Sequence, residues 1–413
     1  MADGLEKIGS RRHFQYIVVG CGGIGSGALY WLSKRAAGDV LGLEQFQLGH
    51  DNGGSQDVSR IIRLTYHDDR YLRLTPATFE AWSEVERESG QQLVYRPGGL
   101  QLSERGETDH IMEKYAVALQ RNNIPFERLT ADQLKARYPQ FTPGPNTVAL
   151  FQKDAGLVDA ALGNATHVQL ARGNGAVVID RCPVLRIGRH PNGNIEVTTT
   201  LGKFTCRRLV VTAGAWINDV LGSIGVHVPV TVTQEQVTYF GTPHMKDFKK
   251  DRRELKFPIF IYHTPRYDFY GMPIHANSGT KIGIDAGGPQ VTASTRTFTP
   301  DPARVKACTD MLQKRIPKFL GPELFTKTCL YAMTPDRHFV VDTCSRQGYS
   351  DVIVCNGAGH AYKFASLLGK ILSELAADGR TRYDISQFNM DRPAITDPNF
   401  KPVFYMGTAQ SKL

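Results

Sequence analysis

The chain lacks an apolar run long enough to span a bilayer, and its first residues carry charges without an apolar signal segment. It has only 7 cysteines, an odd number with no Cys-x-x-Cys spacing. Neither a disulfide framework nor a structural zinc site is therefore indicated. We expect a protein of a reducing compartment that has no metal site and no membrane segment.

A long run of one charge sign is also missing, although Lys and Arg outnumber Asp and Glu and give a formal net charge of +9. The densest basic run, residues 249–254, is interrupted by Asp251 and Glu254. This spread does not indicate a nucleic-acid partner, and it favours a general attraction for anionic substrates and cofactor phosphates. No internal repeat or low-complexity tract is present, and 413 residues suit about two domains.

What the sequence does contain is a buried-strand pattern, residues 16–19, that runs into Gly20-x-Gly22-x-x-Gly25. Gly20 suits a tight turn, Gly22 lets a pyrophosphate approach the backbone, and Gly25 lets the next helix pack close to the sheet. Glu44 ends a second strand about 20 residues further on, where a ribose-binding carboxylate is expected. The alternatives are an ordinary Gly-rich turn and a solvated strand end. The order of strand, turn, helix, strand and acid favours a dinucleotide cofactor.

Two further buried strands end in small-residue turns, one before Gly214 and Trp216 and one before Gly357 and Gly359. Between them, residues 229–296 alternate as in an antiparallel sheet with one face on a core. We predict an α/β fold in which a discontinuous dinucleotide-binding domain is interleaved with an antiparallel-sheet substrate domain. The expected ranges are 10–90, 151–222 and 325–395 for the first domain, 91–150 and 223–324 for the second, and 396–413 for a tail.

The tail ends in Ser411-Lys412-Leu413, which is the peroxisomal address tripeptide. A tripeptide without meaning is the alternative. We predict that the peroxisomal import receptor recognises these residues and that the protein resides in the peroxisome matrix.

The segment Lys327-Thr328-Cys329-Leu330-Tyr331-Ala332-Met333-Thr334-Pro335-Asp336-Arg337-His338-Phe339 closely resembles the covalent-flavin segment of the monomeric sarcosine oxidase and pipecolate oxidase family. These are flavin amine oxidases, and the family also includes fructosyl amino acid oxidases. The resemblance extends from Tyr16 to Pro393. It implies a Rossmann-like FAD-binding domain of the glutathione reductase or p-hydroxybenzoate hydroxylase type. It also implies FAD held by a thioether from Cys329 to the flavin 8-methyl group, whereas a buried structural cysteine is the alternative.

The resemblance further implies roles for several charged and aromatic side chains. Arg60 would stabilise negative charge on the reduced flavin ring, and Lys281 would promote the reaction with oxygen. Arg63 and Lys363 would bind the substrate carboxylate. Tyr270 and Tyr331 would line the substrate pocket, although both could be core aromatics. The expected cofactor-binding residues are Gly20, Gly22, Gly25, Glu44, Ser59, Arg60, Gly214, Trp216, Cys329, Gly357, Gly359, His360 and Lys363.

Two positions on the substrate side depart from the family pattern, because Gln56 and Asp285 stand where histidines are usual. One hypothesis is that Asp285 faces a cationic or polar group of a bulkier or basic amino acid. The alternative is that Asp285 pairs with a neighbouring basic residue and never meets substrate.

The resemblance implies a flavin amine oxidase that converts a secondary or cyclic amino acid, of the sarcosine, N-methyl amino acid or L-pipecolate type, to an imine. Oxygen would reoxidise the flavin and yield hydrogen peroxide, and the protein would be a monomer. One alternative is an oxidase of a fructosyl or lysine-like amino acid, and another is a flavin dehydrogenase with a different acceptor. Two further hypotheses are a non-catalytic flavoprotein and an NAD-dependent dehydrogenase, and the second of these depends on the glycine motif alone.

Overall fold

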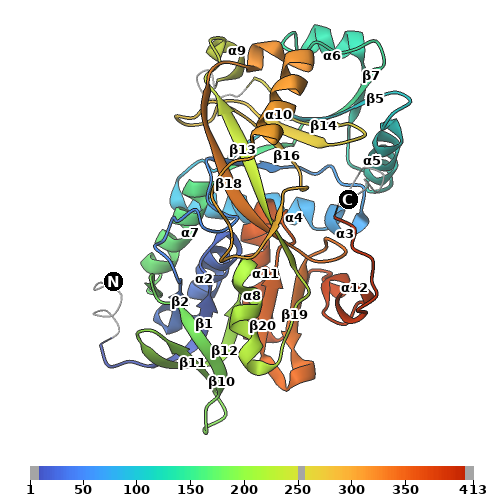
Figure 1. Ribbon diagram of the computed structural model, residues 1–413. Coiled ribbons are helices and arrows are strands. Elements are labelled where there is room, and N and C mark those ends of the chain that lie inside the picture. Colours follow the sequence, from blue (N-terminus) through green and yellow to red (C-terminus); the bar gives the residue numbers. More distant parts are fainter. Residues whose placement is uncertain (1–8, 250–255, 405–413) are drawn as a thin grey trace.

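The computed structural model describes residues 9–249 and 256–404, and it divides into two units, each built on one large sheet (Figure 1). The first sheet has 8 strands in the order β10-β11-β12-β1-β2-β9, and β20 and β19 follow beside β12. Its central strands run parallel. The strands are β1 (His13–Val19), β2 (Val40–Leu43), β9 (Val177–Ile179), β10 (Val184–Arg189), β11 (Ile195–Thr199), β12 (Gly202–Val211), β19 (Val340–Cys344) and β20 (Tyr349–Asn356).

Helices cover one face of this sheet and bury a mixed aliphatic and aromatic core against it, centred on Leu29, Trp82 and Leu368. They are α2 (Gly23–Ala36), α4 (Thr75–Ser89), α7 (Ala160–Gly173) and α11 (Ala365–Asp378). The strands are buried on both faces because a second cluster, which includes Phe204 and Val354, fills the opposite side. Short helices α3 (Asp69–Leu72), α8 (Ile217–Leu221) and α12 (Pro393–Thr396) complete the unit.

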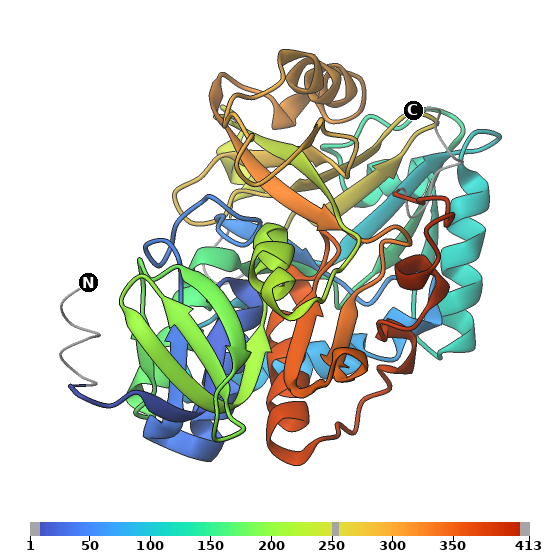
Figure 2. The ribbon, with the colours of Figure 1, turned by 60° about the horizontal axis from the view of Figure 1, so that its bottom comes forward.

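The second sheet has 9 strands and is largely antiparallel, except that β14 runs parallel to β5. Its strands are β5 (Gly99–Glu104), β6 (Glu127–Thr130), β7 (Thr147–Gln152), β13 (Thr231–Phe240), β14 (Ile259–His263), β15 (Asp268–Met272), β16 (Thr280–Ile284), β17 (Gln290–Val291) and β18 (Glu323–Met333). The helices α5 (Asp109–Arg121), α6 (Ala131–Arg137), α9 (Met245–Phe248) and α10 (Pro302–Arg315) lie around it (Figures 1 and 2). A small sheet of β3 (Ser59–Ile62), β8 (Gly156–Asp159) and β4 (Val94–Tyr95) joins the two units.

The predicted α/β fold with an interleaved antiparallel sheet is confirmed. The boundary predicted at residue 325 falls inside β18, which pairs with β13 from Glu323 to Met333. The strand that carries Cys329 is therefore part of the second sheet, and Figure 1 shows it extending from that sheet down to the first unit. The tripeptide 411–413 lies outside the described residues.

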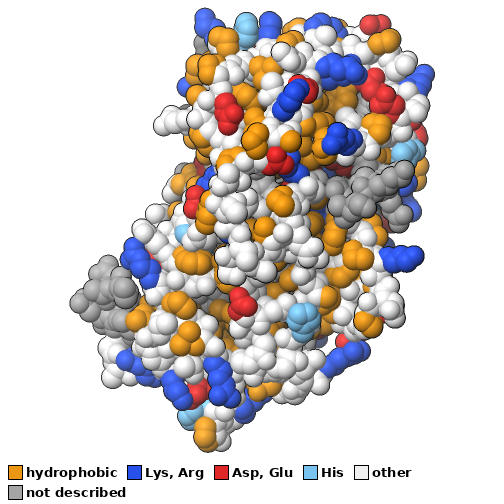
Figure 3. Space-filling model, in the orientation of Figure 1, with side chains coloured by type: hydrophobic (Ala, Val, Ile, Leu, Met, Phe, Trp, Pro, Cys, Tyr) orange, Lys and Arg blue, Asp and Glu red, His pale blue; other side chains and the backbone are white. Residues whose placement is uncertain are grey.

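Charged side chains of both signs are interspersed on the face of the molecule shown in Figure 3, and no large patch of one sign covers that face. The helices that the structure describes include none with the length and apolar character needed to cross a membrane.

Candidate active site

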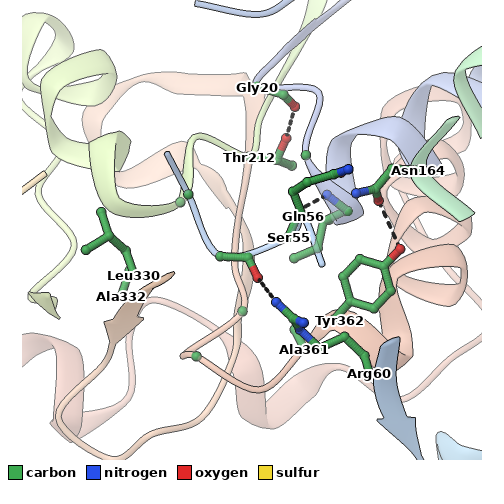
Figure 4. A pocket seen from close by; sticks show the side chains of 18 of the residues that line it. Gly20, Ser55, Gln56, Arg60, Asn164, Thr212, Leu330, Ala332, Ala361 and Tyr362 are labelled. Atoms are coloured by element: carbon green, nitrogen blue, oxygen red, sulfur yellow. Dashed lines mark hydrogen bonds between the residues drawn. The ribbon is translucent and has the colours of Figure 1, made fainter. Parts of the chain in front are cut away.

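A continuous cavity of about 640 Å³ runs between the two units, from the turn after β1 to the second sheet. Glu44 and Arg172 line one end, and Asp285 and Lys363 line the other. Figure 4 shows Ser55, Arg60 and Tyr362 around this cavity, with the Thr212 hydroxyl bonded to the Gly20 carbonyl. The predicted site residues that line it are Gly20, Gly22, Glu44, Gln56, Arg60, Arg63, Gly214, Trp216, Tyr270, Asp285, Tyr331, Gly357, Gly359, His360 and Lys363.

The glycine motif forms a turn that leaves no room for side chains. Gly20 has φ +86°, and a Cβ there would lie 2.8 Å from the Thr212 carbonyl oxygen. A Cβ on Gly25 would lie only 1.8 Å from the Gly20 carbonyl oxygen, so helix α2 packs directly on the turn. Gly22, Gly23 and Ile24 at the start of α2 line the cavity, where a helix N-terminus favours an anion, and the Gly23 N–H donates to the Ser55 hydroxyl at 2.8 Å.

Glu44 follows β2 and is held at the cavity wall. Its carboxylate accepts hydrogen bonds from the backbone N–H of Cys21 at 2.8 Å and of Phe46 at 3.1 Å. The side chain is buried but reaches the cavity beside the glycine turn. The Glu44 carboxylate is therefore placed where it can bind the hydroxyl groups of a ribose.

The turns after β12 and β20 also line the cavity. Gly214 and Gly359 have φ of +54° and +80°, a backbone conformation that favours glycine. A Cβ on Gly359 would lie 2.7 Å from the Tyr331 ring, so the backbone passes close to that side chain. Three turns without bulky side chains, one carboxylate and one long cavity fit a dinucleotide such as FAD.

The centre of the site holds a cluster of charges around Asp57. The Asp57 carboxylate accepts hydrogen bonds from Lys281 Nζ at 2.6 Å and from Tyr239 Oη at 2.5 Å, and it forms an ion pair with Arg60. Lys281 Nζ also donates to the Ser59 carbonyl at 2.6 Å. The Asp57 and Lys281 side chains are 3% and 1% exposed, so their charges compensate each other inside the protein.

The environment shifts the ionisation of all three groups. Burial lowers the pKa of Lys281 to about 8, although the Asp57 carboxylate opposes this shift. Burial alone would raise the pKa of Asp57, but Lys281 and Arg60 hold it well below its usual range. Burial alone would lower the pKa of Arg60, but Asp57 raises it. The cluster therefore carries a net positive charge near neutral pH, and Arg60 presents that charge to the cavity.

The far end of the cavity contains two buried cations. The Arg63 guanidinium lies 4.9 Å from the Tyr66 ring, and its Nε and Nη1 have no hydrogen-bond partner in the described structure. Lys363 Nζ donates to the His360 carbonyl at 2.7 Å, and burial lowers its pKa to about 7, with a further decrease from Arg63. Unpartnered buried donors beside a cavity indicate a site for an anion such as a carboxylate.

Asp285 pairs with a basic residue, as the alternative hypothesis expects, and it also lines the cavity. That it faces a group of the substrate stays a prediction. Arg337 Nη2 donates to Asp285 Oδ1 at 2.7 Å. The Asp285 side chain is 31% exposed, while that of Arg337 is 1% exposed. Burial alone would raise the pKa of Asp285, but Arg337 and then Lys363 lower it. A carboxylate thus faces the same space as the two cations.

Four predicted residues, Gly25, Ser59, Lys281 and Cys329, are not among those that line the cavity. Ser59 and Lys281 belong to the Asp57 cluster. All 7 cysteines lie in the described part of the chain, and only Cys329 is partly exposed. Burial raises the pKa of Cys329 to about 11, although Arg60 opposes this shift. Cys329 and the cavity-lining Tyr331 are two residues apart on β18 and so share a face of the strand.

Sequence reasoning missed Asp57 and Arg337. Asp57 directly follows Gln56 and precedes Arg60 by three residues, so an acid beside a functional cation was a visible but weak signal. Its Lys281 partner is 224 residues away, and only the fold brings them together. Arg337 lies within the segment that carries the family resemblance, but its partners Asp285 and Phe404 are 52 and 67 residues away in sequence.

Comparisons with known proteins agree with this geometry. Residues 15–375 match the family described as FAD dependent oxidoreductase. The chain is 30% identical to monomeric sarcosine oxidase of Arthrobacter sp. (strain TE1826), over 93% of this chain and 98% of that protein. It is 27% identical to N-methyl-L-tryptophan oxidase of Escherichia coli (strain K12), over 92% and 99%. The structure of the open form of NikD, an unusual amino acid oxidase, aligns with TM-score 0.80 and 24% identity over 92% of this chain and 97% of that chain.

Proposed function

Because this chain belongs to the family of FAD-dependent oxidoreductases, we propose that it oxidises a secondary or cyclic amino acid to an imine. Oxygen then accepts the two electrons and is released as hydrogen peroxide. The family match also confirms the predicted FAD cofactor and decides against the NAD reading. The observation that carries the proposal is the buried Arg63 guanidinium, whose Nε and Nη1 have no hydrogen-bond partner in the described structure, in the cavity that Lys363 and the glycine turn also line.

The residues of the cavity supply binding and charge for this reaction. Bound FAD supplies the electron acceptor. Arg63 and Lys363 hold the substrate carboxylate, and a planar guanidinium fits a carboxylate through two parallel hydrogen bonds. This anchoring directs the amine towards the middle of the cavity, where Tyr270 and Tyr331 form the wall. Holding the substrate in one orientation lowers the activation free energy, because the reacting groups are already positioned.

The experiment that tests the proposal is anaerobic bleaching of the flavin absorption by a panel of amino acids. The panel contains sarcosine, N-methyl-L-tryptophan, L-pipecolate, a fructosyl amino acid and lysine, and peroxide is then measured in air. Bleaching by at least one secondary or cyclic amino acid, with peroxide formed in air, supports the proposal. A yellow protein that no amine bleaches would instead support a non-catalytic flavoprotein.

Asp285 favours the second candidate, an oxidase of a bulkier or basic amino acid. Its carboxylate lines the cavity at the end that holds the carboxylate-binding cations. A carboxylate there accepts hydrogen bonds from an ammonium group or hydroxyl groups on a substrate side chain. A large preference for sarcosine over every bulkier amine in the panel would exclude this candidate.

Lys281 separates an oxidase from a flavin dehydrogenase. Its ammonium group, buried in the Asp57 cluster, would stabilise superoxide as electrons pass to oxygen. In the variant Lys281→Met, oxygen reactivity should fall by at least about a hundredfold while anaerobic bleaching by substrate persists. Unchanged oxygen reactivity would favour the dehydrogenase.

We further propose that Cys329 holds FAD covalently. Its partial exposure and its position two residues before the cavity-lining Tyr331 support this assignment. After acid precipitation the yellow colour should remain in the pellet, whereas Cys329→Ser should release it to the supernatant. Colour released from the unaltered protein would refute the attachment.

We also propose a monomer that is imported into the peroxisome matrix through Ser411, Lys412 and Leu413. The full chain fused at its N-terminus to a fluorescent protein should co-localise with a peroxisomal marker, and the chain ending at residue 410 should not. Equal distribution of the two forms would refute this localisation. Size-exclusion chromatography with light scattering should give a mass near 45.8 kDa.

A further inference from the structure

Arg337 is a fully buried guanidinium that links three distant segments of the chain. Its Nη2 donates to Asp285 Oδ1 at 2.7 Å, and its Nη1 donates to the Phe404 carbonyl oxygen at 2.7 Å. Its own carbonyl oxygen lies 3.0 Å from His360 Nε2. The residue has φ +55°, a conformation that non-glycine residues rarely adopt. Such a costly arrangement persists where the surrounding contacts determine it, and it is often functional.

The pairing with Arg337 decides where the Asp285 charge acts. Burial has the largest effect on the pKa of Asp285 and raises it, whereas Arg337 lowers it. Asp285 also lies close enough to Lys363 and Arg63 for both to lower its pKa further. Without Arg337, the Asp285 carboxylate would be the nearest anion for those two cations. It would then compete with a substrate carboxylate for the same donors, among them the unpartnered Nε and Nη1 of Arg63.

The position of Arg337 depends in turn on the last described segment, residues 397–404, which we call the C-terminal strap. The Val403 N–H donates to the Pro335 carbonyl at 2.6 Å, and the Phe404 carbonyl accepts from Arg337. Figures 1 and 2 show this segment leaving α12 and running toward the second unit. The strap therefore contacts the turn that carries Arg337 and holds the guanidinium at Nη1, while Asp285 holds it at Nη2.

We propose that Arg337, held by the C-terminal strap, is a positioning residue that keeps Asp285 away from Arg63 and Lys363. The two cations then stay free for the carboxylate of the ligand. This inference rests on the proposed function only in assigning a carboxylate to Arg63 and Lys363. It adds that the strap, through Arg337, helps to shape the substrate site.

Acetate serves as the test ligand, because it offers a carboxylate and cannot be oxidised as an amine. Its dissociation constant is measured with the FAD-loaded enzyme from changes in the flavin absorption spectrum. Loss of a hydrogen bond between charged groups typically changes an equilibrium by about tenfold to a hundredfold. We expect Arg337→Met to weaken acetate binding by that factor, and the double variant Asp285→Asn/Arg337→Met to restore it to within about threefold of the unaltered enzyme.

Two shortened chains test the strap independently of the substitution. A chain ending at Lys401 lacks both strap hydrogen bonds, and it should bind acetate about tenfold more weakly, again with rescue by Asp285→Asn. A chain ending at Met406 is the matched control, because it retains Val403 and the peptide carbonyl of Phe404 that accepts the hydrogen bond from Arg337. It should bind acetate as the full chain does.

The outcomes separate this inference from the proposed function. Unchanged acetate binding in both Arg337→Met and the chain ending at Lys401 would overturn it, and so would weakened binding that Asp285→Asn fails to rescue. If Arg337→Met does not fold, the chain ending at Lys401 decides. Failure of every amine to bleach the flavin refutes the proposed function but leaves the acetate result standing. An unaltered enzyme that binds no acetate overturns this inference, and bleaching by the amine panel then decides the proposed function separately.

Discussion

Replacement of Asp57 by Asn should destabilise the protein by about 3–5 kcal/mol, which is the usual cost of removing one partner from a buried ion pair. The substitution keeps the shape of the side chain and removes its charge. Lys281 and Arg60 would then be buried cations without their anion, since Lys281 Nζ lies 2.6 Å from Asp57 and its side chain is 1% exposed. The pKa of Lys281, now about 8, should fall further because Asp57 has the largest effect among the groups that raise it.

Urea denaturation followed by far-UV circular dichroism measures this loss, provided that the slope of the transition is unchanged. Tyr239→Phe is the matched control, because it removes one hydrogen bond to Asp57 and no charge. Its cost should be about 1 kcal/mol. The double variant Asp57→Asn/Lys281→Met should recover about 2 kcal/mol of the loss by removing one uncompensated cation. If Asp57→Asn costs no more than Tyr239→Phe, the charge compensation inferred for this cluster is wrong.

Two further outcomes are expected. Lys363 has a pKa of about 7, and a carboxylate ligand binds its protonated form. Acetate binding should therefore weaken about tenfold as the pH rises from about 6 to about 9. The variant Lys363→Met should bind acetate weakly and with little pH dependence. A pH-independent dissociation constant in the unaltered enzyme would contradict this. Gly25→Ala places a Cβ 1.8 Å from the Gly20 carbonyl oxygen, so it should lower the free energy of unfolding by at least about 3 kcal/mol and reduce FAD retention. The control Gly173→Ala has no atom within 4 Å of the new Cβ and should change neither the stability nor the FAD content. Equal FAD content in the two variants would count against the tight turn.

The parts of the site that the sequence predicted well are those in which local geometry dictates the residue. Gly20 needs a positive φ, and Gly25 has no space for a side chain, so their spacing is visible without knowledge of the fold. The strand, turn and helix around them follow from the same local rules. The assignment of Arg63 and Lys363 to one carboxylate depended instead on resemblance, because 300 residues separate them in the chain.

The parts that the sequence could not predict depend on pairings between remote charges. For Asp285, chemistry alone left open a substrate partner or a protein partner, and the structure shows a protein partner on one side and the cavity on the other. Asp57 escaped notice because an isolated acid in a sequence is most often solvated. Its importance follows from the depth at which the fold buries it and from the two cations placed beside it.

The charges at the substrate end explain why the site contains no obvious general base. Arg60 and Arg63 are permanently cationic, and Lys363 adds a charge below a pKa of about 7. Asp57 pairs with Arg60 and Lys281, and Asp285 at the substrate end is already paired with Arg337. An amino acid bound there meets an excess of positive charge, which stabilises its carboxylate and disfavours its ammonium form. The amine of the bound substrate should therefore lose its proton more readily than in water, so that the neutral amine needed for oxidation forms without a dedicated catalytic base.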